Sequence, residues 1–204
     1  MVRHQLDDER VELKYVIPEN LVNYFISLIY SKGFYETYEK RVVNSIYFDN
    51  NNSSLFDSIN GVPKRKKSRI RWYSNDLSIQ IEEKVKLNDI GYKNVQKLTY
   101  VGGELSEKSH LFFEVSSLYF NGLSPVSAVR YHRRYFYNQI FKTRLTIDFN
   151  IETLDYQTQE ARNLGSYVIL EMKYLPGQSI ILPFERFNQK FSKYQFSRIG
   201  FNDY

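Results

Sequence analysis

Cysteine is absent from this sequence, and histidine, tryptophan and methionine are scarce. Without cysteine the chain can form no disulfide, no thiolate metal site and no cysteine nucleophile. The three histidines, His4, His110 and His132, lack the spacing of a metal cluster. The sequence also has no Gly-x-Ser-x-Gly elbow and no glycine-rich turn before Lys-Ser or Lys-Thr. A phosphate site in this protein would therefore have to be built from side chains.

Long apolar runs are absent as well. No segment reaches the roughly 18 apolar residues of a membrane span, and residues 1–15 lack the apolar core of a signal peptide. We therefore expect a cytoplasmic protein. The 204 residues contain 42% hydrophobic residues and no linker or repeat, which favours a single domain over residues 1–204.

Positive charge is in excess, and charged residues follow a regular pattern along the chain. The formal net charge of +5 favours an anionic partner, although it is also ordinary for a soluble protein. In the stretch SRIRWYS, Arg69 and Arg71 fall on one face of a strand and Ile70 on the other. In LSIQIEEKVK, Glu82 and Lys84 alternate in the same way with apolar residues. The pattern predicts paired strands with a charged face.

The same period of two recurs along most of the chain. It predicts eight strands, at residues 9–17, 41–50, 68–74, 77–86, 92–100, 127–138, 143–151 and 166–174. Helical spacing predicts helices over residues 18–33, 106–120 and 183–194. Residues 50–60 are polar and suggest a mobile loop.

Five of these strands carry a charged face of mixed sign, and two interpretations follow. The charges could be the solvent side of an ordinary antiparallel sheet. Alternatively, a closed barrel could bury its apolar face under helices and enclose a polar lumen that binds an anion. The alternation alone leaves both interpretations open.

The motifs RVELKYVI, SIYFDN, SRIRWY, IEEKVK, VRYHRRYF, RLTID, LEMKY and KFSKY occur in this order. Together they resemble the triphosphate tunnel metalloenzymes (CYTH-like proteins), and within them the VTC (vacuolar transporter chaperone) polyphosphate polymerase domain. The superfamily opens with Glu, Glu and Lys at alternate positions, whereas this chain has Arg10, Glu12 and Lys14. That difference favours the polymerase branch over thiamine triphosphatases and class IV adenylate cyclases.

The resemblance implies an α+β fold, an eight-stranded antiparallel β-barrel with flanking helices. The barrel would form a tunnel that binds a triphosphate and a divalent cation, Mg²⁺ or Mn²⁺. The residues implied in phosphate contacts are Lys14, Arg69, Arg71, Lys84, Arg133, Arg144 and Lys173. Lys93 is a further substrate-binding candidate, for which Lys97 could substitute. Glu171 matches the metal-binding glutamate. Glu12 and Glu82 are further metal candidates that could instead hold neighbouring cations, and Asp148 could do either. Lys190 and Lys193 are expected on one side of a helix at the tunnel mouth, and with Glu12 they are predicted to bind substrate.

The function implied is transfer of the γ-phosphoryl group of a nucleoside triphosphate, ATP first among them, to a growing polyphosphate chain. Eukaryotic family members carry membrane spans, so a membrane protein could act as a partner in trans. The alternatives are a phosphohydrolase with the same tunnel and a binding module for polyphosphate or nucleic acid without turnover. Tyr15 and Tyr73, interpreted as lying opposite the cationic faces, argue against base stacking, so no nucleic-acid partner is expected.

Overall fold

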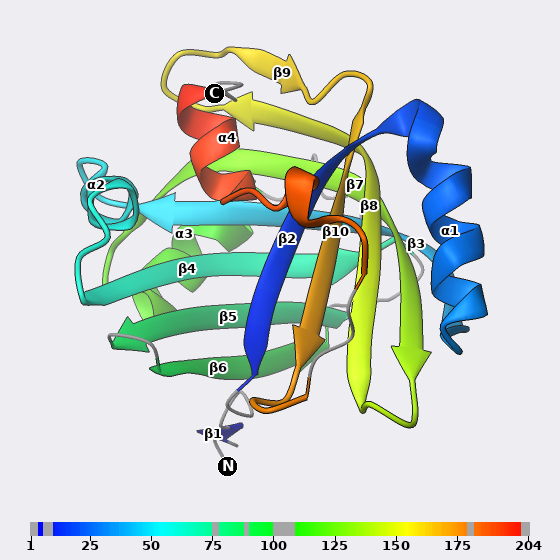
Figure 1. Ribbon diagram of the computed structural model, residues 1–204. Coiled ribbons are helices and arrows are strands. Elements are labelled where there is room, and N and C mark those ends of the chain that lie inside the picture. The colour runs from blue at the N-terminus through cyan, green and yellow to red at the C-terminus, as the bar shows by residue number, and fades with distance from the viewer. Residues whose placement is uncertain are drawn as a thin grey trace.

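The computed structural model describes residues 4–5, 10–74, 78–87, 90–99, 109–178 and 182–200. Its centre is a single antiparallel sheet with the strand order β1-β6-β5-β4-β3-β7-β8-β10-β2, and β9 pairs with β8 at the side (Figure 1). The strands are β1 (His4–Gln5), β2 (Val11–Pro18), β3 (Tyr35–Asp49), β4 (Lys64–Tyr73), β5 (Ser78–Leu87), β6 (Ile90–Thr99), β7 (Ser124–Asn138), β8 (Thr143–Asp155), β9 (Ala161–Asn163) and β10 (Tyr167–Tyr174). All eight predicted strands are therefore confirmed.

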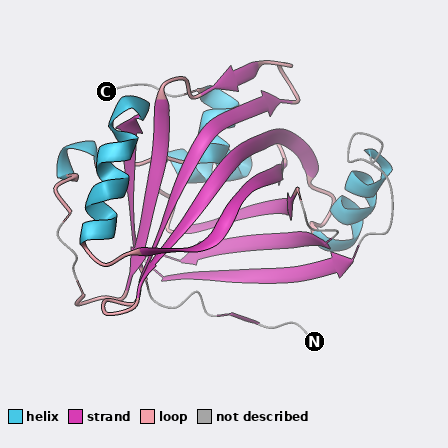
Figure 2. Cartoon of the chain, turned by 90° about the vertical axis from the view of Figure 1, so that its right-hand side faces the viewer, coloured by secondary structure: helices cyan, strands magenta, loops and turns pink. Residues whose placement is uncertain are grey.

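The helices are α1 (Val22–Ser31), α2 (Ser53–Ile59), α3 (Ser109–Tyr119) and α4 (Lys193–Ile199), with short 3₁₀ turns η1 (Glu19–Leu21) and η3 (Glu185–Phe187). Figure 2 shows one strongly curved sheet with helices packed around it. Within the described ranges, no helix is long and apolar enough to cross a membrane.

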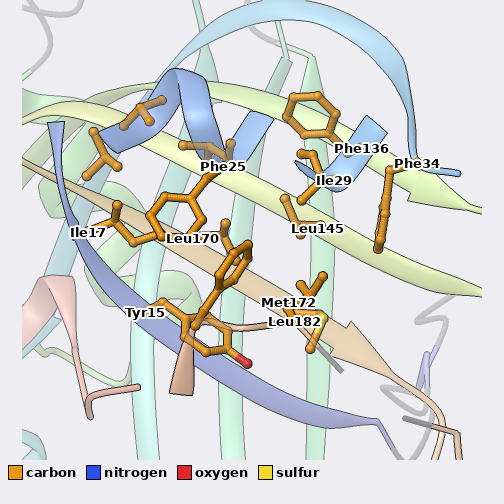
Figure 3. Close-up of a cluster of buried hydrophobic side chains, with 14 residues drawn as sticks. Tyr15, Ile17, Phe25, Ile29, Phe34, Phe136, Leu145, Leu170, Met172 and Leu182 are labelled. Carbon is orange, nitrogen blue, oxygen red and sulfur yellow. The ribbon is translucent and has the colours of Figure 1, made fainter. Parts of the chain in front are cut away.

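Two of the three apolar clusters lie on the outside of the curve, where helices cover them. Phe25 and Ile29 of α1 pack on Ile17, Leu145 and Leu170 from β2, β8 and β10 (Figure 3). A second outer cluster is formed by α3 and the adjoining turn with β3, β4 and β5, and it contains Ile46, Phe48, Ile70, Ile79, Ile81, Val115 and Phe120. Burial of both clusters leaves the charged strand faces on the inside of the curve.

The sheet does not close into a barrel, so that part of the prediction is wrong, while the α+β class, the antiparallel pairing and the flanking helices are confirmed. Among the described residues, no backbone ladder joins β2 to β4, β5 or β6. In Figure 1, β2 and β10 cross in front of β4 and β5 at a wide angle, which prevents such a ladder. Side chains span the gap instead. Lys84 of β5 lies 3.5 Å from Glu12 of β2, and Lys67 of β4 donates to Ser192 at 3.1 Å.

Two local predictions are wrong. Residues 183–194 do not form one helix, because the chain makes the turn η3, runs beside β2 through the Gln189 to Lys14 backbone bond, and starts α4 only at Lys193. Residues 50–60 are not a loop, because they contain α2. The carboxylate of Asp49 organises that helix by accepting bonds from the backbone amides of Asn50, Ser54 and Leu55.

One end of the inner face is filled by α4. Tyr194 and Phe196 pack there with apolar residues of the inner strand faces, among them Val43, Val129 and Ile169. The Tyr194 hydroxyl also donates to Asp49 at 2.5 Å, which ties α4 to the start of α2. The charged part of the inner face therefore lies beyond this apolar end.

Candidate functional site

The first group of inner-face charges lies on the neighbouring strands β2 and β10 and is reached from β5. Lys14 Nζ lies 2.9 Å from Glu12 and 4.0 Å from Glu171, while Lys173 Nζ lies 3.2 Å and 3.3 Å from the same two carboxylates. Lys84 reaches Glu12 from β5. Register explains the arrangement, since Glu171 pairs with Lys14 and Lys173 with Glu12 across β10 and β2.

Both glutamates of this group are held in the ionised form. Burial and the neighbouring Glu171 would raise the pKa of Glu12, but Lys14, Lys173 and Lys84 together lower it to about 2. Burial opposes ionisation of Glu171 too, yet Lys173 and Lys14 keep its pKa well below the ordinary value. The site therefore holds two adjacent carboxylates that are charged at neutral pH.

The second group surrounds Glu82 of β5. Arg69 Nε donates to Glu82 at 2.5 Å, and Arg69 Nη2 lies 2.5 Å from the same carboxylate oxygen. Lys93 of β6 donates to the other oxygen at 2.6 Å. Arg71 is held by the hydroxyls of Ser45 and Tyr131, each at 3.2 Å. The two guanidinium groups are thus fixed in direction before any ligand binds.

The third group surrounds Asp148 of β8, whose side chain is fully buried. Arg133 donates hydrogen bonds to both carboxylate oxygens, at 2.6 Å and 2.8 Å, and Lys193 of α4 lies 2.5 Å from one of them. The Tyr131 ring contacts both cations, with Arg133 Cζ and Lys193 Nζ at 5.1 Å and 4.8 Å from its centroid. Because the Asp148 side chain is fully buried and both its oxygens bind these cations, it holds cations in place.

Comparison with known proteins agrees with this geometry. The VTC domain family model matches residues 9–198. The chain belongs to the VTC domain family. A search of curated proteins finds no match.

Solved structures similar to this VTC domain are remote in sequence. A protein of Vibrio parahaemolyticus described as a "putative adenylate cyclase" has a TM-score of 0.52 and 15% identity, over 83% of this chain and 78% of that one. A Bacillus halodurans protein described in the same words has a TM-score of 0.49 and 12% identity, over 84% and 82% of the two chains. PH1819 of Pyrococcus horikoshii has a TM-score of 0.48 and 13% identity, over 81% and 77%. At these identities, the Vibrio likeness supports the fold alone.

Not every candidate of the VTC domain joins the three groups. Arg144 is exposed at one end of the inner face, opposite Lys173 in register, and within the described part of the chain it has no ion pair. Lys190 is exposed in the segment before α4, so it does not share a helix face with Lys193. Lys97 is exposed, whereas Lys93 reaches Glu82, which makes Lys93 the better placed of the two lysines.

Lys67 is an inner-face residue that the sequence interpretation missed. It donates to Ser192, and its Nζ lies 5.9 Å from the Tyr194 ring centroid. Burial, followed by the charges of Lys14 and Lys84, lowers the pKa of Lys67 to about 7. The alternation that placed Arg69 and Arg71 on one face also places Lys67 there, so the sequence carried the signal.

A divalent cation at this site would bind to a pair of carboxylates rather than to a larger cluster. No group of three or more His, Cys, Asp or Glu side chains occurs in the described ranges. Glu12 and Glu171, however, are both ionised, and each forms ion pairs with Lys14 and Lys173 within 4.0 Å. A hard cation such as Mg²⁺ or Mn²⁺ needs few protein oxygens when phosphate oxygens supply the rest. The residues therefore fit a metal that binds together with its phosphate ligand.

Proposed function

We propose that this VTC domain binds the triphosphate of a nucleoside triphosphate on its inner face and transfers the γ-phosphoryl group to the end of a polyphosphate chain. The observation that supports this most is the convergence of cations from β2, β4, β5, β6, β7, β10 and α4 on one face, where they outnumber the carboxylates. These cations are Lys14, Lys67, Arg69, Arg71, Lys84, Lys93, Arg133, Lys173 and Lys193.

The arginines and the lysines of this face suit different contacts with the substrate. Arg69, Arg71 and Arg133 are each fixed by a protein partner, so they suit directional contacts with the phosphates of the nucleotide. The lysines are less directional and suit a polymer that must move after each transfer. No protein nucleophile is required, because the attacking phosphate oxygen is already anionic and the main tasks are alignment and charge stabilisation.

Glu171, with Glu12 beside it, would hold the divalent cation, which supplies further neutralisation of phosphate charge when bound. Lys14 and Lys173 would then turn from these carboxylates toward phosphate oxygens. Arg144 and Lys190 lie at the exposed margins of the site. We assign them to the substrate or the emerging chain as it enters and leaves.

The deciding experiment is incubation of the purified protein with ATP and Mn²⁺ or Mg²⁺, with the products resolved by length on a gel and ADP measured in parallel. A ladder of polyphosphate together with ADP is the expected result. Free phosphate and ADP without a ladder would make the protein a phosphohydrolase. Tight binding of ATP or polyphosphate without ADP release would make it a binding module.

Triphosphate binding should also take up protons near pH 8. The pKa of Lys67 is lowered to about 7 and that of Lys93 to about 8, in both cases first by burial, so both lysines are partly neutral at that pH. A polyanion favours their charged forms and raises both pKa values, which draws protons onto the protein. ATP is already fully ionised there, because its terminal pKa lies near 6.

Titration calorimetry with ATP and a chelator, in two buffers of different ionisation enthalpy, measures this proton uptake. The Lys67→Met variant should take up fewer protons than the wild type. Heats that do not depend on the buffer would show that neither lysine changes protonation on binding.

A further inference from the structure

Three tyrosines surround an exposed arginine at the other end of the inner face from α4. The Arg41 Cζ atom lies 4.8 Å from the ring centroid of Tyr38, 5.8 Å from that of Tyr73 and 5.9 Å from that of Tyr135. Tyr38 is 55% exposed and meets Tyr135 edge to face at 5.5 Å. We call Tyr38, Arg41, Tyr73 and Tyr135 the tyrosine–arginine cluster.

The position of Tyr73 corrects the sequence interpretation. Period two from Arg69 and Arg71 places Tyr73 on their face, and the structure packs its ring against the inner apolar cluster and beside Arg41. The argument that aromatic rings lie opposite the cations therefore holds for Tyr15, which belongs to the outer core, but is wrong for Tyr73.

The tyrosine–arginine cluster is continuous with the cationic groups. Arg41 pairs in register with Arg133, whose Cζ atom lies 5.9 Å from the Tyr135 ring. Along β3, Arg41 is four residues from Ser45, the partner of Arg71, which corresponds to about 13 Å of strand. That separation is comparable to the length of an extended nucleoside triphosphate.

Two features of the cluster are unexplained by packing alone. The Tyr135 hydroxyl is buried and has no hydrogen-bond partner in the described part of the chain, although a buried hydroxyl normally has one. The register of β3 against β7 also shifts on both sides of Tyr38, between Glu36 and Tyr38 and between Tyr38 and Arg41. Such irregularities re-aim side chains at the end of a strand pair.

We propose that the tyrosine–arginine cluster binds the base of the nucleoside triphosphate by stacking, a step that rests on the proposed function. A planar base can stack on the exposed Tyr38 ring and on the guanidinium plane of Arg41, and the Tyr135 hydroxyl can form a hydrogen bond with the nucleoside. Because every base has a π-face, this site prefers nucleotides over inorganic triphosphate and discriminates weakly among bases, with purines favoured by their larger area.

The test compares two ligands, ATP and inorganic tripolyphosphate, by calorimetry in the presence of a chelator. Tyr38→Ala should weaken ATP binding about tenfold, which is typical of one lost stacking contact, and should change tripolyphosphate binding less than twofold. Arg41→Lys keeps the charge and removes the guanidinium plane, so it should show the same selective loss. Tyr24→Ala removes a tyrosine of similar exposure on the outer helix α1 and should leave both affinities unchanged.

Measuring both ligands distinguishes a failure of the base-site proposal from a failure of the proposed function. Equal weakening of both ligands in Arg41→Lys and Tyr38→Ala would place the cluster on the phosphates and overturn the base site. Unchanged affinity for ATP in both variants would overturn it as well. A wild-type protein that binds neither ligand would instead overturn the proposed function itself.

Discussion

The Glu171→Gln variant should lose metal-dependent turnover by at least about 10²-fold while it still binds ATP. The substitution preserves size but removes one of the two adjacent charged carboxylates that fit a divalent cation. Lys14 and Lys173 lose a partner at the same time, so the inner face becomes more cationic and should hold the nucleotide as tightly as before. ADP release and calorimetric ATP binding, measured on the same preparation, should therefore diverge.

Glu83→Gln is the matched control for this variant. Glu83 is next to Glu82 on β5 but points to the other face, where it pairs with Lys66. It should retain full turnover. A Glu171→Gln protein with undiminished metal-dependent ADP release would remove Glu171 from the mechanism, and thermal unfolding of both variants would reveal any loss of fold.

The Asp148→Asn variant should lower the free energy of unfolding by about 3–5 kcal/mol, the usual cost of removing one partner from a buried ion pair. Asp148 is fully buried and bonds both Arg133 and Lys193, so the substitution leaves two cations beside each other without their counter-charge. Urea unfolding monitored by tryptophan fluorescence or circular dichroism measures the loss.

Glu36→Gln provides the comparison for an exposed pair. Glu36 also binds an arginine through two bonds, to Arg134 at 2.8 Å and 2.9 Å, but both side chains are partly exposed on the outer face. Its loss should cost about 1 kcal/mol or less. Equal losses in the two variants would mean that burial of Asp148 contributes little. Added polyphosphate should stabilise Asp148→Asn more than Glu36→Gln, because in Asp148→Asn the anion also replaces the missing charge.

Much of the local structure could be predicted, because side-chain alternation is a property of the extended backbone. Strands with strict alternation, such as those that carry Arg69 and Glu82, were predicted within a few residues of their observed ends. Helix predictions succeeded where an apolar stripe matched a packed face, as for Phe25 and Ile29 of α1. They failed over residues 183–194, where the aromatic residues pack on two different faces of the sheet. Phe184 belongs to the outer core and Tyr194 to the inner one, so no single helix could serve both.

The sequence by itself determined where the strands lie along the chain, the charged face of five of them and the family resemblance, all of which depend on short-range pattern. Only the tertiary structure decided that the sheet stays open and that Lys193, and not Lys190, pairs with Asp148. It also decided that Arg41 contacts tyrosines from β4 and β7. These outcomes depend on the crossing angle of strands and on contacts between residues more than 30 positions apart. The alternation of residues along a strand predicts which face a side chain points to, but the packing of the whole chain determines which residues it contacts there.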